Sequence, residues 1–71
     1  MPLVNVKLPE GSLSPAQKTK LAQNLTDAVV AVEGEKMRGF VWVVIDEVKS
    51  GDWNIGGKAL TPELLRTMAA G

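Results

Sequence analysis

The sequence predicts a small α/β domain built on a strand–helix–strand unit, and three stretches of the chain carry this prediction. Residues 3–8 alternate apolar and polar side chains, which is typical of a strand with one buried face. Residues 15–33 repeat apolar side chains at helical spacing, and residues 40–45 form an apolar run rich in β-branched residues. A helix between two strands predicts a βαβ unit, with a right-handed connection and parallel strands.

The first strand and the helix have recognisable ends. Pro2 suits the start of the strand, where no ladder hydrogen bond is lost, and the turn at residues 9–11 ends it. Ser14 and Gln17 form a capping box at the start of the helix, and Gly34 terminates it. The buried stripe of this helix is expected to contain Leu21, Leu25, Ala28, Val29 and Val32.

The second strand is apolar at nearly every position from Phe40 to Ile45, so both of its faces are expected to be buried. One helix covers only one face of a sheet, and a second subunit is expected to cover the other. After a loop at residues 48–51, residues 53–57 predict a hairpin. A short helix is expected to begin near Pro62, which gives one domain over residues 1–71.

The composition argues against several classes of function. Eight basic and eight acidic side chains are interspersed, without the basic stripe of a nucleic-acid-binding protein. The chain has neither His nor Cys, which excludes a disulfide and a Ser-His-Asp triad and argues against a zinc site. No run is long enough for a membrane helix and no signal peptide is recognisable, so a cytoplasmic location is expected.

Pro2 is the candidate catalytic residue. Met1 is normally removable when the next residue is as small as proline, and its removal leaves Pro2 as a free secondary amine. In a chain without His or Cys, the α-amino group is the group whose ordinary pKa, about 7.7–8, lies nearest neutrality. Pro2 is therefore the general base that needs the least adjustment of its pKa.

Several motifs occur in a fixed order over roughly residues 2–57, and together they resemble one family. They are Pro2 behind Met1, Glu10-Gly11 after the first strand, one long helix, Asp46-Glu47 at the end of the second strand, and Gly51, Trp53 and Ile55-Gly56-Gly57 around the hairpin. In this order and spacing the chain resembles the 4-oxalocrotonate tautomerase family, the short-chain members of the tautomerase superfamily.

The resemblance implies a βαβ subunit that pairs into a four-stranded sheet, with a hexamer favoured and a trimer or dimer left open. It also implies a tautomerase or isomerase that needs no cofactor. Unprotonated Pro2 would take a proton from an enol hydroxyl, or from a carbon beside a carbonyl, and return it elsewhere on the conjugated system. Trp53 stands at the family's aromatic position, where an apolar wall lowers the pKa of the amine.

The sequence departs from the family at two substrate-binding positions. Family members carry an arginine directly after the Glu-Gly turn and another early in the second strand, where this chain has Ser12 and Trp42. Neither side chain replaces a cationic clamp, so the usual dicarboxylate substrate is not expected. Lys7 and Arg38 are candidate replacements, as is Lys58, with a solvated surface role as the competing interpretation of all three.

Two hypotheses of function remain. The first is an oligomeric tautomerase that acts on a small enol or keto compound, with an aromatic 2-keto acid or another less anionic substrate among the options. The second is a catalytically silent subunit, which pairs with an arginine-bearing paralogue in a hetero-oligomer. For Trp42, the alternative to a substrate contact is a place in the core or in a subunit interface. Asp46 or Glu47 could activate water beside Pro2, although a solvated strand end is the simpler interpretation.

Overall fold

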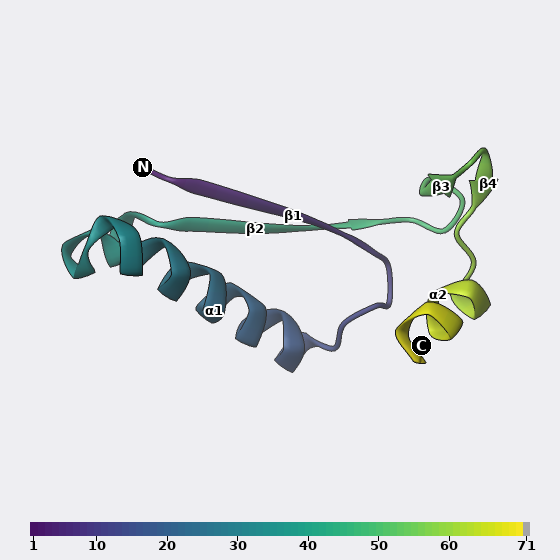
Figure 1. Cartoon of the computed structure of the whole chain (residues 1–71), viewed down its shortest axis with the longest axis horizontal. Coiled ribbons are helices and arrows are strands. Elements are labelled where there is room, and N and C mark those ends of the chain that lie inside the picture. The colour runs from purple at the N-terminus through teal and green to yellow at the C-terminus, as the bar shows by residue number, and fades with distance from the viewer. Residues whose placement is uncertain (71) are drawn as a thin grey trace.

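A computed structural model describes residues 1–70 of the chain, and it contains the predicted strand–helix–strand unit. The elements are β1 (Leu3–Pro9), α1 (Pro15–Glu33), the 3₁₀ helix η1 (Glu35–Phe40), β2 (Trp42–Val48), β3 (Asn54–Ile55), β4 (Lys58–Ala59) and α2 (Pro62–Ala70). β1 and β2 are parallel neighbours, and α1 runs along one side of them (Figure 1). The βαβ prediction, with its C-terminal hairpin and helical tail, is confirmed.

The start and end of α1 follow the capping prediction. The Gln17 N–H donates to Ser14 Oγ at 3.2 Å, and the Ser14 N–H donates to Gln17 Oε1 at 2.9 Å. At the other end the Gly34 N–H donates to the Val30 carbonyl at 2.8 Å. Gly34 has a φ of 104°, a conformation that side-chain-bearing residues rarely adopt, so glycine is required at this exit.

The buried stripe of α1 lies slightly to one side of the predicted one. Val30 is the buried residue of this helix, whereas Ala28 is exposed and Val32 is 88% exposed. Leu21, Leu25 and Val29 are half-buried, as predicted. Two adjacent apolar stripes are compatible with the helical period, and the position of the sheet selects the one that contains Val30.

The second strand begins and ends later than the apolar run predicts. Phe40 belongs to η1, and the ladder with β1 begins where Leu3 pairs with Trp42. Because β1 begins at Leu3, residues before Trp42 have no partner strand, and an apolar sequence alone does not make them a strand. Val48, predicted to lie in a loop, pairs with Pro9 and ends the ladder.

The two faces of the β1–β2 sheet differ in exposure. Half-buried side chains such as Val4, Val6 and Ile45 alternate with more exposed ones along both strands, and α1 covers their side. The other side, which we call the open face, carries Leu3, Asn5 and Lys7 of β1 and Trp42, Val44 and Asp46 of β2. The expected burial of both faces of β2 is therefore not reached within one chain.

The chain is extended for its size. Its accessible surface is 5287 Å², whereas a compact monomer of 7.6 kDa exposes about 4,300 Å². Its radius of gyration is 14.8 Å against about 11 Å for a compact chain of this length. Val30 and Leu60 are the buried residues of the described part, each 7% exposed. The hairpin and α2 extend beyond the end of the sheet, away from α1 (Figure 1).

Candidate functional site

Pro2 and Trp42 lie side by side where β1 and β2 begin. The Trp42 N–H donates to the Pro2 carbonyl at 2.9 Å, and the next residue, Leu3, is paired with Trp42. This contact fixes the backbone of Pro2 against the first residue of β2. Arg38 lies four residues before Trp42, in η1 at the same end of the sheet (Figure 1). We call this region the Pro2 end.

The other candidate residues lie at the opposite end of the sheet. Ser12 follows β1, Trp53 follows β2, and Lys7 lies in the last half of β1. The seven residues of β1 span roughly 20 Å, so Ser12 and Trp53 are far from Pro2 within one chain. The structure thus divides the candidates into two groups, with Pro2, Trp42 and Arg38 in one and Lys7, Ser12 and Trp53 in the other.

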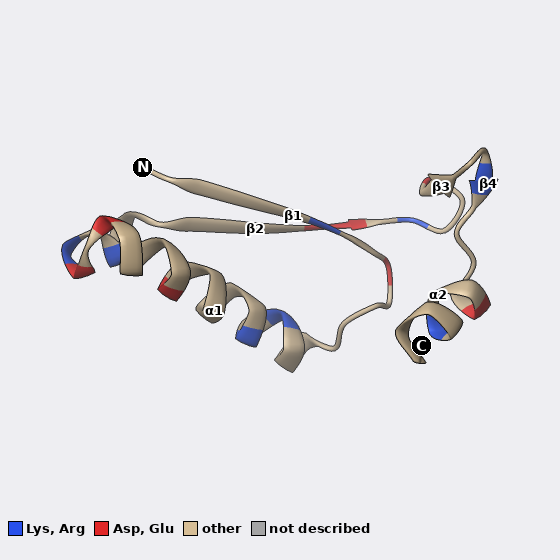
Figure 2. Ribbon diagram, viewed as in Figure 1, with Lys and Arg blue, Asp and Glu red and all other residues tan. Residues whose placement is uncertain are grey.

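Arg38 is held by two carboxylates of its own chain. Its Nη1 lies 2.8 Å from Asp27 Oδ1 in α1, and its Nε lies 2.7 Å from Glu35 Oε1 in η1. A second hydrogen bond, from Nη2 to Glu35 Oε2 at 3.2 Å, makes the contact with Glu35 bidentate. The hydrogen bonds that Arg38 donates to Glu35, and then to Asp27, raise the pKa of Arg38, and the bond to Glu35 lowers the pKa of Glu35. The guanidinium is therefore engaged within its own chain. Blue and red ribbon segments accordingly lie together at the end of the molecule where α1 ends (Figure 2).

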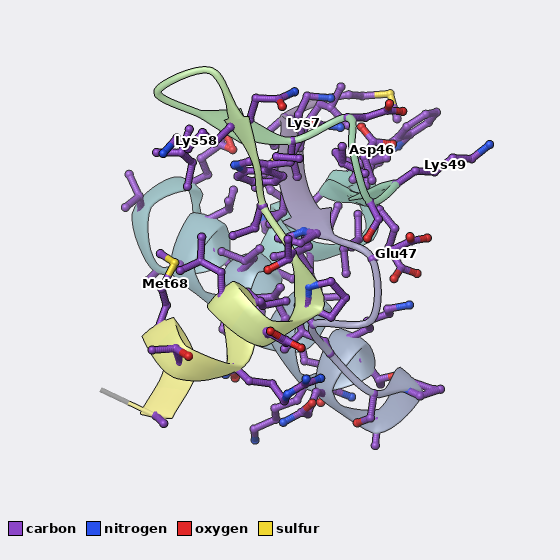
Figure 3. The ribbon with its side chains drawn as sticks, turned by 90° about the vertical axis from the view of Figure 1, so that its right-hand side faces the viewer. Lys7, Asp46, Glu47, Lys49, Lys58 and Met68 are labelled. Atoms are coloured by element: carbon purple, nitrogen blue, oxygen red, sulfur yellow. The ribbon has the colours of Figure 1, made fainter. Side chains whose placement is uncertain are left out.

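Lys7 is also paired, on the open face. Its Nζ lies 3.2 Å from Asp46 Oδ2, which accepts a second hydrogen bond from Asn5 Nδ2 at 3.0 Å. Figure 3 shows Lys7 and Asp46 close together. The hydrogen bond from Asn5, followed by that from Lys7, lowers the pKa of Asp46. A carboxylate stabilised in this way is a weak base, which gives no support to Asp46 as an activator of water.

Glu47 connects three segments on the helix-covered side of the sheet. It accepts a hydrogen bond from Lys18 Nζ in α1 and another from the Gly11 N–H at 3.2 Å. Lys18 first and the Gly11 N–H second lower the pKa of Glu47. Glu47 thus has a local role in joining the turn after β1 to α1. It lies far along β2 from Pro2, so the chain gives no support to it as a water-activating group beside that residue.

Ser12 and Trp53 have different surroundings at the opposite end. Ser12 Oγ is buried and has no hydrogen-bond partner among residues 1–70. Trp53 is half-buried and borders a small pocket that is also lined by Pro9, Leu60 and Leu65. The Trp53 carbonyl accepts a hydrogen bond from the Leu60 N–H at 2.7 Å. In one chain, then, Trp53 packs against the base of the hairpin and α2.

Three residues at the Pro2 end were not predicted from the sequence. Asp27 and Glu35 pair with Arg38 and so decide whether its guanidinium is free to bind a substrate. In the sequence, the three-residue spacing of Glu35 and Arg38 was the one signal of these ion pairs. Phe40 was assigned to the strand, but it ends η1 and is 52% exposed. Among residues 1–70, no three acidic side chains form a group that could hold a metal ion. Within the same range no helix is long and apolar enough to cross a membrane.

Comparison with known proteins agrees with this fold. The family model described as tautomerase enzyme matches residues 2–62, which includes Pro2 and the hairpin. The chain belongs to the tautomerase family. It is similar to a protein named probable tautomerase in Dickeya dadantii, with 34% identity over 61 residues that cover 86% of this chain and 90% of the relative.

Solved structures of family members share the fold. A 4-oxalocrotonate tautomerase homologue superimposes with a TM-score of 0.73 at 33% identity, covering 80% of this chain and 87% of that one. TomN, a homologue in the tomaymycin biosynthetic pathway, gives a TM-score of 0.75 at 29% identity and covers 96% of this chain and 95% of its own. Family and fold together support tautomerase-type isomerase activity for this chain.

Proposed function

We propose that this member of the tautomerase family is an oligomeric enzyme in which Pro2, once Met1 is removed, is the general base. The observation that carries the proposal is the placement of Pro2 directly before β1, with its carbonyl fixed by the Trp42 N–H at 2.9 Å. This contact holds the residue without using its nitrogen. Met1 precedes the strand and is 75% exposed, so a processing aminopeptidase has access to it.

The proposed step is a proton transfer that leaves atoms and electrons in balance. The Pro2 nitrogen takes the proton of an enol hydroxyl, the oxygen electron pair forms the carbonyl, and the electrons of the carbon–carbon double bond take a proton back from the prolinium. No oxidant, reductant or other co-reactant is consumed. The amine must be unprotonated near neutral pH, which an ordinary pKa of about 7.7–8 allows in part and apolar surroundings favour further.

The proposed oligomer accounts for the exposed surface and for the divided site. The chain exposes roughly 1,000 Å² more than a compact monomer of its mass, and its open face carries Val44 at 38% exposure away from the rim. One chain keeps Pro2 far from Ser12 and Trp53, so a site that uses both groups requires two copies. We propose a homo-oligomer in which neighbouring copies join the two ends, and we take the hexamer as its form.

The test combines intact mass with enzyme kinetics. Protein that has lost Met1 is expected to accelerate the ketonisation of a small enol carboxylic acid, followed by the loss of the enol absorbance. Pro2→Ala is expected to lower kcat by about 10²-fold or more, because it replaces the secondary amine of the base. Full activity in Pro2→Ala would contradict the assignment of the base.

A second outcome would favour the alternative function. If the processed homo-oligomer is inert towards enols but becomes active when it is mixed with an arginine-bearing paralogue, the chain is a structural subunit of a hetero-oligomer. The control is the same mixture with the Pro2→Ala chain, which shows whether the activity of the mixture uses this amine.

A further inference from the structure

The surface next to Pro2 is apolar. Leu3, Phe40 and Trp42 are 61%, 52% and 56% exposed, and they come from the start of β1 and the segment that leads into β2. We call these three residues the Pro2 patch. Leu3 and Trp42 are the first residues of their strands, so they lie at the rim of the open face rather than at its centre. A second copy that covers the centre of that face would leave the patch at its edge.

Arg38, the cation closest in sequence to this patch, is not free. Asp27 and Glu35 contact its guanidinium, and together with Lys36 of the same 3₁₀ helix these four charges sum to zero. A substrate carboxylate would have to displace one of these partners, including the bidentate contact with Glu35. A dianionic substrate is thus disfavoured, because it finds no free guanidinium and no net positive charge in this group.

Lys7 does not add a free positive charge near the patch. It lies five residues along the chain from Pro2, and its ammonium is paired with Asp46 on the open face. Lys58 has no ion pair within residues 1–70, but it lies in β4 of the hairpin, at the end of the molecule opposite Pro2 (Figure 1). A neighbouring copy that brings Trp53 to Pro2 would also bring Lys58 of the same hairpin. Its ammonium could then bind one substrate carboxylate.

We propose that the Pro2 site selects an enol or ketone with an aromatic body and at most one carboxylate, and that Trp42 is the specificity-determining residue. This inference rests on the proposed function. The indole of Trp42 offers a flat apolar face on which a ring can stack, with one N–H donor and no charge. An arginine at the same position would instead bind a second carboxylate through a charged fork.

The experiment compares two enol substrates with protein that has lost Met1. One is a 2-hydroxy-3-arylpropenoate, with one carboxylate and a ring, and the other is 2-hydroxyhexa-2,4-dienedioate, with two carboxylates and no ring. The wild type is expected to favour the aryl substrate by about tenfold or more in kcat/KM. Trp42→Arg is expected to shift this ratio by about tenfold or more towards the diacid, and Trp42→Phe to keep the aryl preference.

A second variant tests the charge argument without touching the sheet. Asp27 and Glu35 are surface residues, 61% and 74% exposed at their side chains, and D27N together with E35Q frees Arg38. This double variant is expected to raise kcat/KM for the diacid and leave the aryl substrate within about twofold. Circular dichroism and sedimentation are the controls that check whether each variant keeps its fold and assembly.

The outcomes separate the two proposals. A wild-type preference for the diacid, or a substrate ratio that neither Trp42→Arg nor the double variant changes, overturns the inference about specificity. If Pro2→Ala abolishes turnover in the same series, the assignment of Pro2 as the base still holds even when the inference about specificity fails. If Pro2→Ala leaves turnover of both substrates intact, the proposed function itself is wrong.

Discussion

The open face of the sheet gives the sharpest test of assembly, through Val44→Lys. Val44 lies near the middle of β2 on the open face and is 38% exposed in the single chain. In an isolated subunit a lysine there reaches water at little cost, as at most surface positions. If a second copy covers this face, the same lysine places an unpaired ammonium in the interface, because the nearby Asp46 is already paired with Lys7. The substitution therefore distinguishes an exposed face from a covered one.

The size of the effect follows from the cost of burying charge. An unpaired charge in such an interface costs several kcal/mol after relaxation. With about 3 kcal/mol per copy and two copies in a symmetric pair, association weakens by about 6 kcal/mol, or roughly 10⁴-fold in Kd. Sedimentation velocity at a fixed micromolar concentration is then expected to show the wild-type oligomer replaced by smaller species.

Val32→Lys is the matched control for this experiment. Val32 is 88% exposed on α1, so the same change in side chain adds a solvated lysine. The control is expected to keep the wild-type sedimentation coefficient and thermal midpoint. If Val44→Lys also sediments as the wild type does, the open face is not an interface and the reasoning from exposed surface fails.

Three further predictions concern the stability of the subunit, measured as the free energy of unfolding in urea. Ser14→Ala removes one half of the capping box and is expected to cost about 1 kcal/mol, so an unchanged midpoint would show that the box contributes nothing. Gly34→Ala forces a side chain into a conformation with φ of 104° and is expected to cost about 1–3 kcal/mol; a neutral result would contradict the backbone argument, since no atom lies near the added Cβ. The third concerns pH. Because Lys18 and the Gly11 N–H lower the pKa of Glu47 in the folded chain, its stabilising effect is present above its ordinary value of 4.5 and is lost as the pH falls through the lowered value. Glu47→Gln is therefore expected to lower stability at neutral pH and to match the wild type well below pH 4.5; equal stability at both would refute the assigned contact.

The parts of the fold that the sequence predicted are those that local chemistry decides. The Ser14 capping box, the glycine after α1 and the period-two strand before it each depend on a few adjacent residues. The start of β2 depends instead on where β1 begins, because a strand exists only where it has a partner. That is why the apolar run at Phe40 was assigned to a strand although it ends η1.

The candidate site shows the same limit more strongly. Pro2 and Trp53 were named from their positions along the chain, but nothing local shows that they lie at opposite ends of one subunit. The pairing of Arg38 with Asp27 spans 11 residues and two elements, so only the folded structure shows that its guanidinium is already occupied. Sequence identified residue types and spacing, whereas the structure decided which of those side chains are still free to act.

The small core of the subunit has a consequence for how the protein behaves on dilution. Val30 and Leu60 are its buried residues over positions 1–70, so in the proposed oligomer much of the apolar surface that drives folding is hidden only when copies meet. Folding and association then become one process, and the stability of the folded state increases with the concentration of protein, as it does with the concentration of a ligand. The thermal midpoint should rise with the logarithm of concentration, and refolding should show a kinetic order above one. A destabilising substitution in this family member would thus be masked in a concentrated sample and revealed in a dilute one.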